Sequence, residues 1–285
     1  MQSYIGYFRA SYKEAVVYRF RLLFMLMSPL VLMIVQYFLW NSLYDSTAEP
    51  LFGIAREQYI NYVFVGLAIG YLTANMVDLF IADDIKTGMI TSIYSRPVSH
   101  MFTWFAKFLG GKIVELVIVF PLIIVLLYLG SDSITTSAVV AFSASTVMAI
   151  FLAFLINYLF GLMSFVTTNY WGVMFLKGSL IAIFSGQLIA LDAFQHFDSS
   201  LLESVVPGRV IDIVGPFIAF VGYLSDVLPF KGIFYIPSGI YSGIISSQYE
   251  IYRGLVHQLT WVLVLGISAF VIEKKLKDNL VVLGG

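Results

Sequence analysis

The sequence predicts an all-α integral membrane protein, a single transmembrane domain over residues 1–285 with six transmembrane helices. Of the 285 residues, 60% are hydrophobic and 12% are charged, whereas about 25% of the residues of a soluble domain are charged. Apolar runs of about 20 residues, enough to cross the hydrocarbon core of a bilayer, recur along the chain. The predicted spans are Leu22–Leu43, Tyr59–Ile81, Phe108–Leu129, Ala138–Val166, Val173–Leu191 and Leu255–Ile272.

Residues 1–20, ahead of the first span, are predicted to form a helix in the membrane interface. Apolar side chains gather on one face of this helix, and Arg9 and Lys13 lie opposite. This is the pattern of a helix that lies flat on a bilayer; the alternative is a frayed cytoplasmic tail. The apolar face consists of Tyr4, Ile5, Phe8, Tyr12, Ala15 and Val16.

The connection between spans two and three is too long for a turn and predicts a short amphipathic helix over residues 84–96. Asp83 lies where a helix N-terminus favours negative charge, and Pro97 disfavours helical geometry at the residue before it. Ser99 can then cap the next helix. The apolar stripe suits either docking into the groove of a partner protein or resting on lipid headgroups. The residues concerned are Asp84, Ile85, Met89, Ile90, Ile93, Tyr94 and Arg96.

The region between spans five and six, residues 193–249, holds apolar runs that prolines and glycines interrupt. The runs are too short to cross a bilayer, and they predict short helices or a re-entrant hairpin that dips into the outer leaflet. A compact extracellular loop is the alternative. Residues 273–285, after the last span, are predicted to be a cytoplasmic tail.

The distribution of lysine and arginine predicts that both termini are cytoplasmic. With six spans, twelve basic residues fall on the side of the termini and four on the other, and cytoplasmic connections are the ones rich in these residues. The first group is Arg9, Lys13, Arg19, Arg21, Lys86, Arg96, Lys107, Lys112, Lys177, Lys274, Lys275 and Lys277, and the second is Arg56, Arg209, Lys231 and Arg253.

Ionisable residues within predicted spans are candidates for function. Asp78 lies about one turn before the cytoplasmic end of span two, and Lys112 and Glu115 form an i, i+3 pair at the start of span three. Because these residues lie near an interface, we expect them to pair or to reach water rather than to relay protons. We favour a structural or gating pair between Asp78 and Lys112, since one short helix joins their spans.

Small residues in span two permit a close contact of that helix. Gly66 and Gly70 form a G-x-x-x-G pattern, which lets another segment approach closely, either within the chain or across a dimer.

The residue types that the chain lacks argue against several kinds of site. There is no cysteine, and the three histidines are scattered, so disulfides, thiolate metal sites and His-rich metal centres are not expected. The chain has no G-x-x-x-x-G-K-[ST] phosphate-binding loop. We therefore predict no catalytic residue, cofactor-binding residue or metal ligand, and we expect that the chain is not itself an enzyme. The net charge of −1 argues neither for nor against nucleic acid, and no nucleic-acid partner is predicted.

Taken together, these features resemble the permease subunit of a type-2 ABC transporter, over essentially the whole chain. Three motifs are similar to those of a prokaryotic subgroup of this class: "DDIKTGMITSIYSRPVSH", "SGQLIALDAF" and "LPFKGIFYIPSGIYSG". Such subunits have an N-terminal connecting helix, a cytoplasmic coupling helix between spans two and three, and re-entrant helices between spans five and six. The chain departs from this pattern by about twenty extra residues, "SSLLESVVPGRVIDIVGPFIAF", between the second and third motifs.

The resemblance implies a second permease, identical or homologous, and two copies of a separate ABC ATPase subunit that bind ATP and magnesium and engage residues 84–96. It implies export of an amphipathic, lipid-like or peptide substrate across the cytoplasmic membrane of a prokaryote, where membrane lipids are the remaining partner. The expected path is the dimer interface, lined by spans one, two and five. Its polar candidates are Gln36, Tyr37, Asn75, Asn157 and Gln187.

Two other functions remain open at this point. A secondary transporter that needs no ATPase predicts a charge near the midplane and inverted repeats, and the sequence displays neither. A non-transporting membrane partner would pass ATPase-driven force to an envelope complex through residues 193–249.

Overall fold

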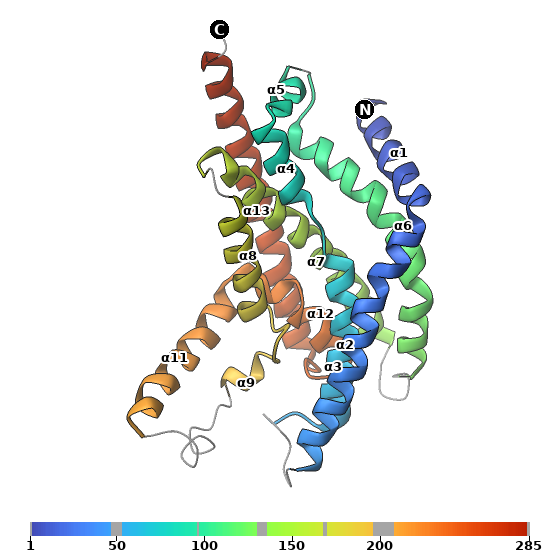
Figure 1. Ribbon diagram of the computed structural model, residues 1–285. Helices are drawn as coiled ribbons and strands as arrows, with labels where there is room; N and C mark the ends of the chain where they lie inside the picture. The colour runs from blue at the N-terminus through green and yellow to red at the C-terminus, as the bar shows by residue number, and fades with distance from the viewer. Residues whose placement is uncertain are drawn as a thin grey trace.

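The computed structural model describes residues 2–46, 53–95, 97–129, 136–167, 170–195 and 208–283, and every regular element in these ranges is helical. The all-α prediction is therefore confirmed for this part of the chain. The long helices run alongside one another, and the start of α1, the short helix α5 and the end of α13 lie at the same end of the bundle (Figure 1). We call this end of the bundle the α5 end.

The N-terminal helix α1 (Gln2–Val17) packs along α6 (His100–Leu129), and only Tyr18 separates it from α2 (Arg19–Asp45). The contact between α1 and α6 is close because Gly110 has no side chain: a Cβ there would overlap the carbonyl oxygen of Phe8. The predicted N-terminal helix is thus present, and part of its apolar face contacts protein while Ile5 and Tyr12 stay exposed. The Tyr4 ring lies edge-on to Phe102 of α6, with 6.2 Å between the ring centroids.

The predicted second span is broken into two helices, α3 (Arg56–Thr73) and α4 (Val77–Lys86). Asn75 causes the break by bonding to nearby backbone in place of the helical ladder. Its amide nitrogen donates to the Thr73 carbonyl over 3.1 Å, and its amide oxygen accepts from the Val77 N–H over 3.3 Å.

The predicted single helix over residues 84–96 is also wrong as one element. Helix α4 ends at Lys86, Gly88 takes the left-handed conformation with φ of 74°, and α5 covers only Met89–Tyr94. A glycine adopts this backbone without the Cβ penalty of other residues, so the chain turns here. The predicted cap of the following helix is confirmed, because the Phe102 N–H donates to Ser99 Oγ over 3.3 Å.

Helix α7 (Thr136–Leu162) with the 3₁₀ turn η2 (Met163–Phe165) agrees with the predicted fourth span. The predicted fifth span is shorter than expected, since α8 (Tyr170–Phe184) has 15 residues and the chain is not helical from Ser185 to Ala190. Fifteen residues rise about 22 Å, less than the hydrocarbon thickness of about 30 Å. The predicted end of this span was taken from the apolar residues alone, and an apolar run does not indicate where the backbone stops being helical.

The region between spans five and six contains the short helix α9 (Asp192–Gln195), α11 (Gly208–Val227), the 3₁₀ turn η3 (Pro229–Gly232) and α12 (Tyr235–Ser242). Helix α12 is enclosed by α3, α7 and α13, and its residues from Ile236 to Ser242 are all buried. This packing uses the glycines of span two: a Cβ at Gly66 would overlap the Phe234 ring, and one at Gly70 would lie 3.7 Å from Gln187 Nε2. The close contact that these glycines predicted is therefore made within the chain.

The last helix, α13, runs unbroken over Gln248–Leu283, so residues 273–283 of the predicted cytoplasmic tail continue the helix of the last span. In the described ranges, three helical stretches are long and apolar enough to cross a membrane: Arg56–Lys86, Thr136–Phe165 and Gln248–Lys277. The chain thus has the helices of a membrane protein, and the first of these three stretches carries the break at Asn75.

Candidate functional site

The turn formed by α4, α5 and the start of α6, which we call the α5 corner, holds the residues predicted to contact a partner. Ile90 is 2% exposed, and Ile93 and Tyr94 are also buried, whereas Met89 is 58% exposed. The prediction that the apolar stripe faces outward is therefore wrong for most of its members, because the stripe packs on the protein's own core. Ile85 is partly buried against the same core and Asp84 is half-buried; Arg96 lies outside the described residues.

Over residues 83–95, the outward face of the corner is polar around one large apolar side chain, Met89. Met89 stands among charged, hydroxyl and glycine residues that are all exposed. They are Asp83, Lys86, Thr87, Gly88, Thr91, Ser92 and Ser95. A partner would therefore contact one methionine and its polar surroundings.

Glu273 of α13 stabilises the α5 corner by capping the N-terminus of α6. Its carboxylate accepts from the His100 N–H over 2.7 Å, from the Met101 N–H over 3.1 Å and from Ser99 Oγ over 3.0 Å. These two N–H groups belong to the first turn of α6, where no helical acceptor exists and negative charge is favourable. The N-terminal helix adds a second support, since the Ser99 N–H donates to the Tyr4 hydroxyl over 2.9 Å.

His100 links this cap to the core through a chain of hydrogen bonds. Trp104 Nε1 donates to His100 Nε2 over 3.1 Å, so the ring proton lies on Nδ1 and is donated to the Tyr158 hydroxyl over 3.0 Å. The Tyr158 hydroxyl in turn donates to Glu273. Burial, with a further contribution from Lys107, lowers the pKa of His100 to about 3.

Acidification is expected to destabilise the fold through His100. Because its pKa is about 3 in the folded protein and about 6.5 when unfolded, the unfolded state binds more protons between these values. Stability is therefore complete above pH 6.5 and falls as the pH is lowered, by about 2 kcal/mol at pH 5. Melting curves at pH 7.5 and 5.0 should show this loss, and His100→Gln should reduce the difference between the two; an equal loss in the variant would contradict the assignment.

The break in the second span lies between two buried charges of opposite sign. Lys112 of α6 donates from Nζ to the Ala74 carbonyl over 2.8 Å, at the carbonyl end of α3, and pairs with Glu115 as its spacing predicted. Asp78 occupies the first turn of α4. The predicted pair of Asp78 with Lys112 is not formed, because each residue serves a different end of the break.

Asp78 instead pairs with Lys177 of α8, a residue for which the sequence predicted only a cytoplasmic charge. Asp78 Oδ2 accepts from Lys177 Nζ and from the Tyr170 hydroxyl, and Lys177 Nζ also donates to Asn157 Oδ1 over 2.5 Å. We call these four residues the Asp78 cluster. A lysine inside a 15-residue apolar helix was a signal for this site, and Glu273, a lone acid before three lysines, was a signal for the cap.

The five residues predicted to line a path do not form one group. Asn157 belongs to the Asp78 cluster and is buried, and Asn75 bonds locally at the break. Gln36 accepts from Trp40 Nε1 over 2.9 Å. Tyr37 and Gln187 are exposed, on α2 and on the unwound segment after α8.

Tyrosines hold the unwound segment after α8 in place. The Tyr62 hydroxyl donates to the Gly186 carbonyl over 2.7 Å, and the Tyr235 N–H donates to the Ser185 carbonyl over 2.9 Å. The Tyr235 hydroxyl donates to Asp192 over 2.8 Å. The segment is therefore a built part of the fold, and Gln187 is its exposed amide next to Gly70 of α3.

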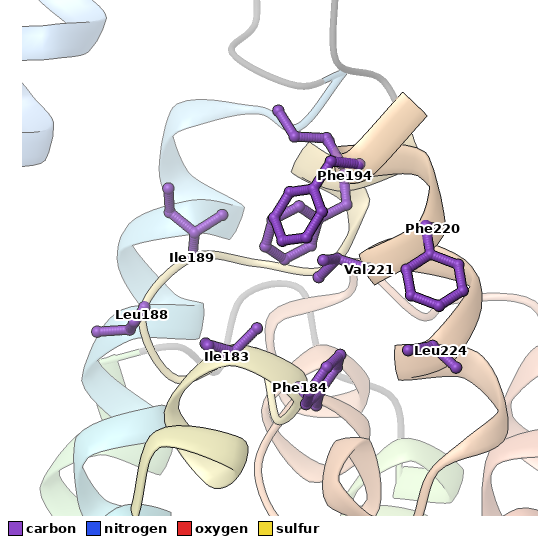
Figure 2. A pocket seen from close by; sticks show the side chains of 10 residues that line it. Ile183, Phe184, Leu188, Ile189, Phe194, Phe220, Val221 and Leu224 are labelled. Carbon is purple, nitrogen blue, oxygen red and sulfur yellow. The ribbon is translucent and has the colours of Figure 1, made fainter. Parts of the chain in front are cut away.

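An apolar cavity of about 320 Å³ lies between the end of α8, the unwound segment, α9 and α11. Figure 2 shows Phe184, Leu188, Phe194 and Leu224 around it, and no charged or polar side chain lines it. Its lining suits the hydrocarbon part of a ligand.

Comparison with known proteins gives no match: no family model, no curated protein and no solved structure matches the chain.

Proposed function

We propose that this chain is the membrane-spanning permease subunit of an ATP-driven exporter of the type-2 ABC class, with six spans and both termini in the cytoplasm of a prokaryote. It pairs with a second permease, and two separate ATPase subunits bind ATP and magnesium. The substrate is amphipathic, lipid-like or a peptide.

The observation that carries the proposal is the α5 corner. The corner presents one exposed methionine on a polar face, while three buried side chains below it fix it to the core. Glu273 and Tyr4 anchor the start of the next helix. A push on such a surface is passed to α4, α6 and α13 rather than absorbed by a loose loop, which is what coupling to a moving ATPase requires.

Two features support a path for an amphipathic substrate. Spans two and five are both discontinuous, and their breaks expose Gln187 and part of Asn75. Unwound segments of membrane helices occur where a cavity or substrate is lined, because their free backbone groups need partners. The apolar cavity beside the break in span five offers room for hydrocarbon.

The proposal is tested by purifying the chain with a candidate ABC ATPase, sought first among the products of the neighbouring genes. Met89→Asp with Ser92→Asp places two charges on the exposed face of the corner without touching its buried side, and at least a tenfold loss of ATPase binding is expected, about 1.4 kcal/mol or more. Ile93 is unsuitable for this test because it is buried and an aspartate there would disturb the fold.

The matched control is Tyr249→Asp, which adds a charge at an exposed aromatic in the first turn of α13. The control should bind the ATPase as the wild type does. Equal binding by the corner variant and the wild type would remove the α5 corner from the proposed interface.

A further inference from the structure

The first half of α8 is attached to the bundle mainly through the Asp78 cluster, whereas Leu180, Ile181 and Phe184 near its end pack on the apolar core. Only two of its residues are buried, Tyr170 and Lys177, and these are the two that donate to Asp78. The other large side chains in the first half of α8 are exposed or half-buried, with Phe175 at 79%. In a membrane, lipid tails compete with apolar helix contacts, so polar contacts count for more in holding a helix in place.

The partner in this contact, α4, is the helix that leads into the α5 corner. Asp78 sits in its first turn, and the corner follows its last residue, Lys86. Helix α4 is separated from α3 by the break at Ala74–Met76 and from α5 by the turn at Gly88. The cluster therefore attaches α8 to a short helix that is continuous with neither α3 nor α5.

Close packing of α4 on α7 fixes the position of Asp78. A Cβ at Gly161 of α7 would lie 3.0 Å from the Asp78 Cα and 3.0 Å from Ile81 Cβ, so α4 lies directly on α7. Asn157, one turn before Gly161, completes the cluster by accepting from Lys177. The cluster is thus a built site, in which Asp78 is 2% exposed and Lys177 is 8% exposed.

A buried ion pair of this kind favours two discrete arrangements. Separating Asp78 from Lys177 inside the protein leaves two buried charges without partners, which is strongly unfavourable. The pair is therefore either fully made or parted far enough for both groups to find water or new partners, and intermediate positions of α8 are disfavoured.

We propose that the Asp78 cluster is a latch between the corner-bearing helix α4 and α8. With the latch closed, α8 is held against α4 and α7, as in this structure. With the latch open, α8 swings away from α4 while the apolar packing of α4 on α6 and α7 stays in place. This inference concerns the chain alone and does not depend on an ATPase partner.

The latch is tested by measuring the distance between spin labels on α4 and α8. The chain has no cysteine, so labels at Asp83→Cys and Phe175→Cys, both exposed positions, have no background. The wild-type chain in lipid nanodiscs should give one narrow distance. The double variant Asp78→Asn/Lys177→Met, which leaves no unpaired charge, should shift the main population to a longer distance.

A second label pair at Val147→Cys and Leu263→Cys, exposed on α7 and α13, should keep its distance in all variants and thereby shows that the bundle is intact. Leu176→Ala, at an exposed position beside Lys177 on α8, should leave the α4–α8 distance unchanged. If the double variant gives the narrow wild-type distance while the bundle is intact, the latch does not exist.

Asp78→Asn/Lys177→Gln decides the question if the first double variant does not fold. It keeps hydrogen-bond donors and acceptors in the cluster and leaves no unpaired charge, and we expect a second, longer α4–α8 distance beside the first. A single unchanged distance in this variant would overturn the proposal.

Discussion

Gly110→Ala is expected to separate α1 from α6 and to destabilise the protein. The new Cβ would overlap the Phe8 carbonyl oxygen and would lie 3.1 Å from both Ser11 Cβ and the Tyr12 nitrogen. Two of these atoms belong to the backbone of α1, which cannot give way as a side chain can, so the whole helix must move. Overpacking of this kind costs about 1–3 kcal/mol, and the added methyl group recovers at most about 1 kcal/mol through helix propensity.

Gly111→Ala is the matched control, one residue away in the same helix. No atom lies within 4 Å of a Cβ at Gly111, so this variant should be as stable as the wild type or more stable by about 1 kcal/mol. The measurement is the melting temperature in detergent, together with the rate at which protease cuts α1. Equal melting temperatures for the two variants would show that α1 does not pack on α6 at Gly110.

Glu273→Ala is expected to loosen the α5 corner and to lower stability by about 3 kcal/mol or more. The change leaves the His100 and Met101 N–H groups and the Ser99 hydroxyl without their acceptor. Each buried donor left unpaired costs about 1–3 kcal/mol. The melting temperature should fall, and amide hydrogen exchange should accelerate over residues 97–103.

Two variants separate this cap from a general effect on α13. Glu273→Gln keeps one acceptor oxygen and should lose less stability than the alanine variant. Glu250→Ala removes an exposed acid from the first turn of the same helix and should cost less than about 1 kcal/mol. Exchange at residues 97–103 that does not change in Glu273→Ala would contradict the cap.

Local patterns in the sequence predicted the local features of this structure. The composition predicted helices, Ser99 was predicted as the cap of α6, and Lys112 and Glu115 pair as their spacing indicated. The cap and the ion pair depend on residues a few positions apart, whose relative placement in a helix is known in advance.

The features that the sequence did not predict depend on residues far apart in the chain. Asp78 meets Lys177, 99 positions away, and Glu273 caps a helix that begins at His100. The apolar periodicity at Ile90 and Ile93 located an apolar face correctly, but it does not distinguish a face covered by the chain's own core from one covered by a partner. The end of α8 was missed because the apolar run resumes at Leu188 after Ser185–Gln187, and tertiary bonds from Tyr62 and Tyr235 hold the unwound segment.

The central claim, that the α5 corner receives an ABC ATPase, is tested most directly by cross-linking from Met89. In the cysteine-free chain, Met89→Cys carries a photoreactive label in the assembled complex, and Tyr249→Cys carries the same label as the control. The account predicts an adduct with the ATPase from position 89, changed in yield by ATP, and none from position 249. An ATPase that binds the chain but forms no adduct from position 89, or forms one equally from position 249, would contradict it.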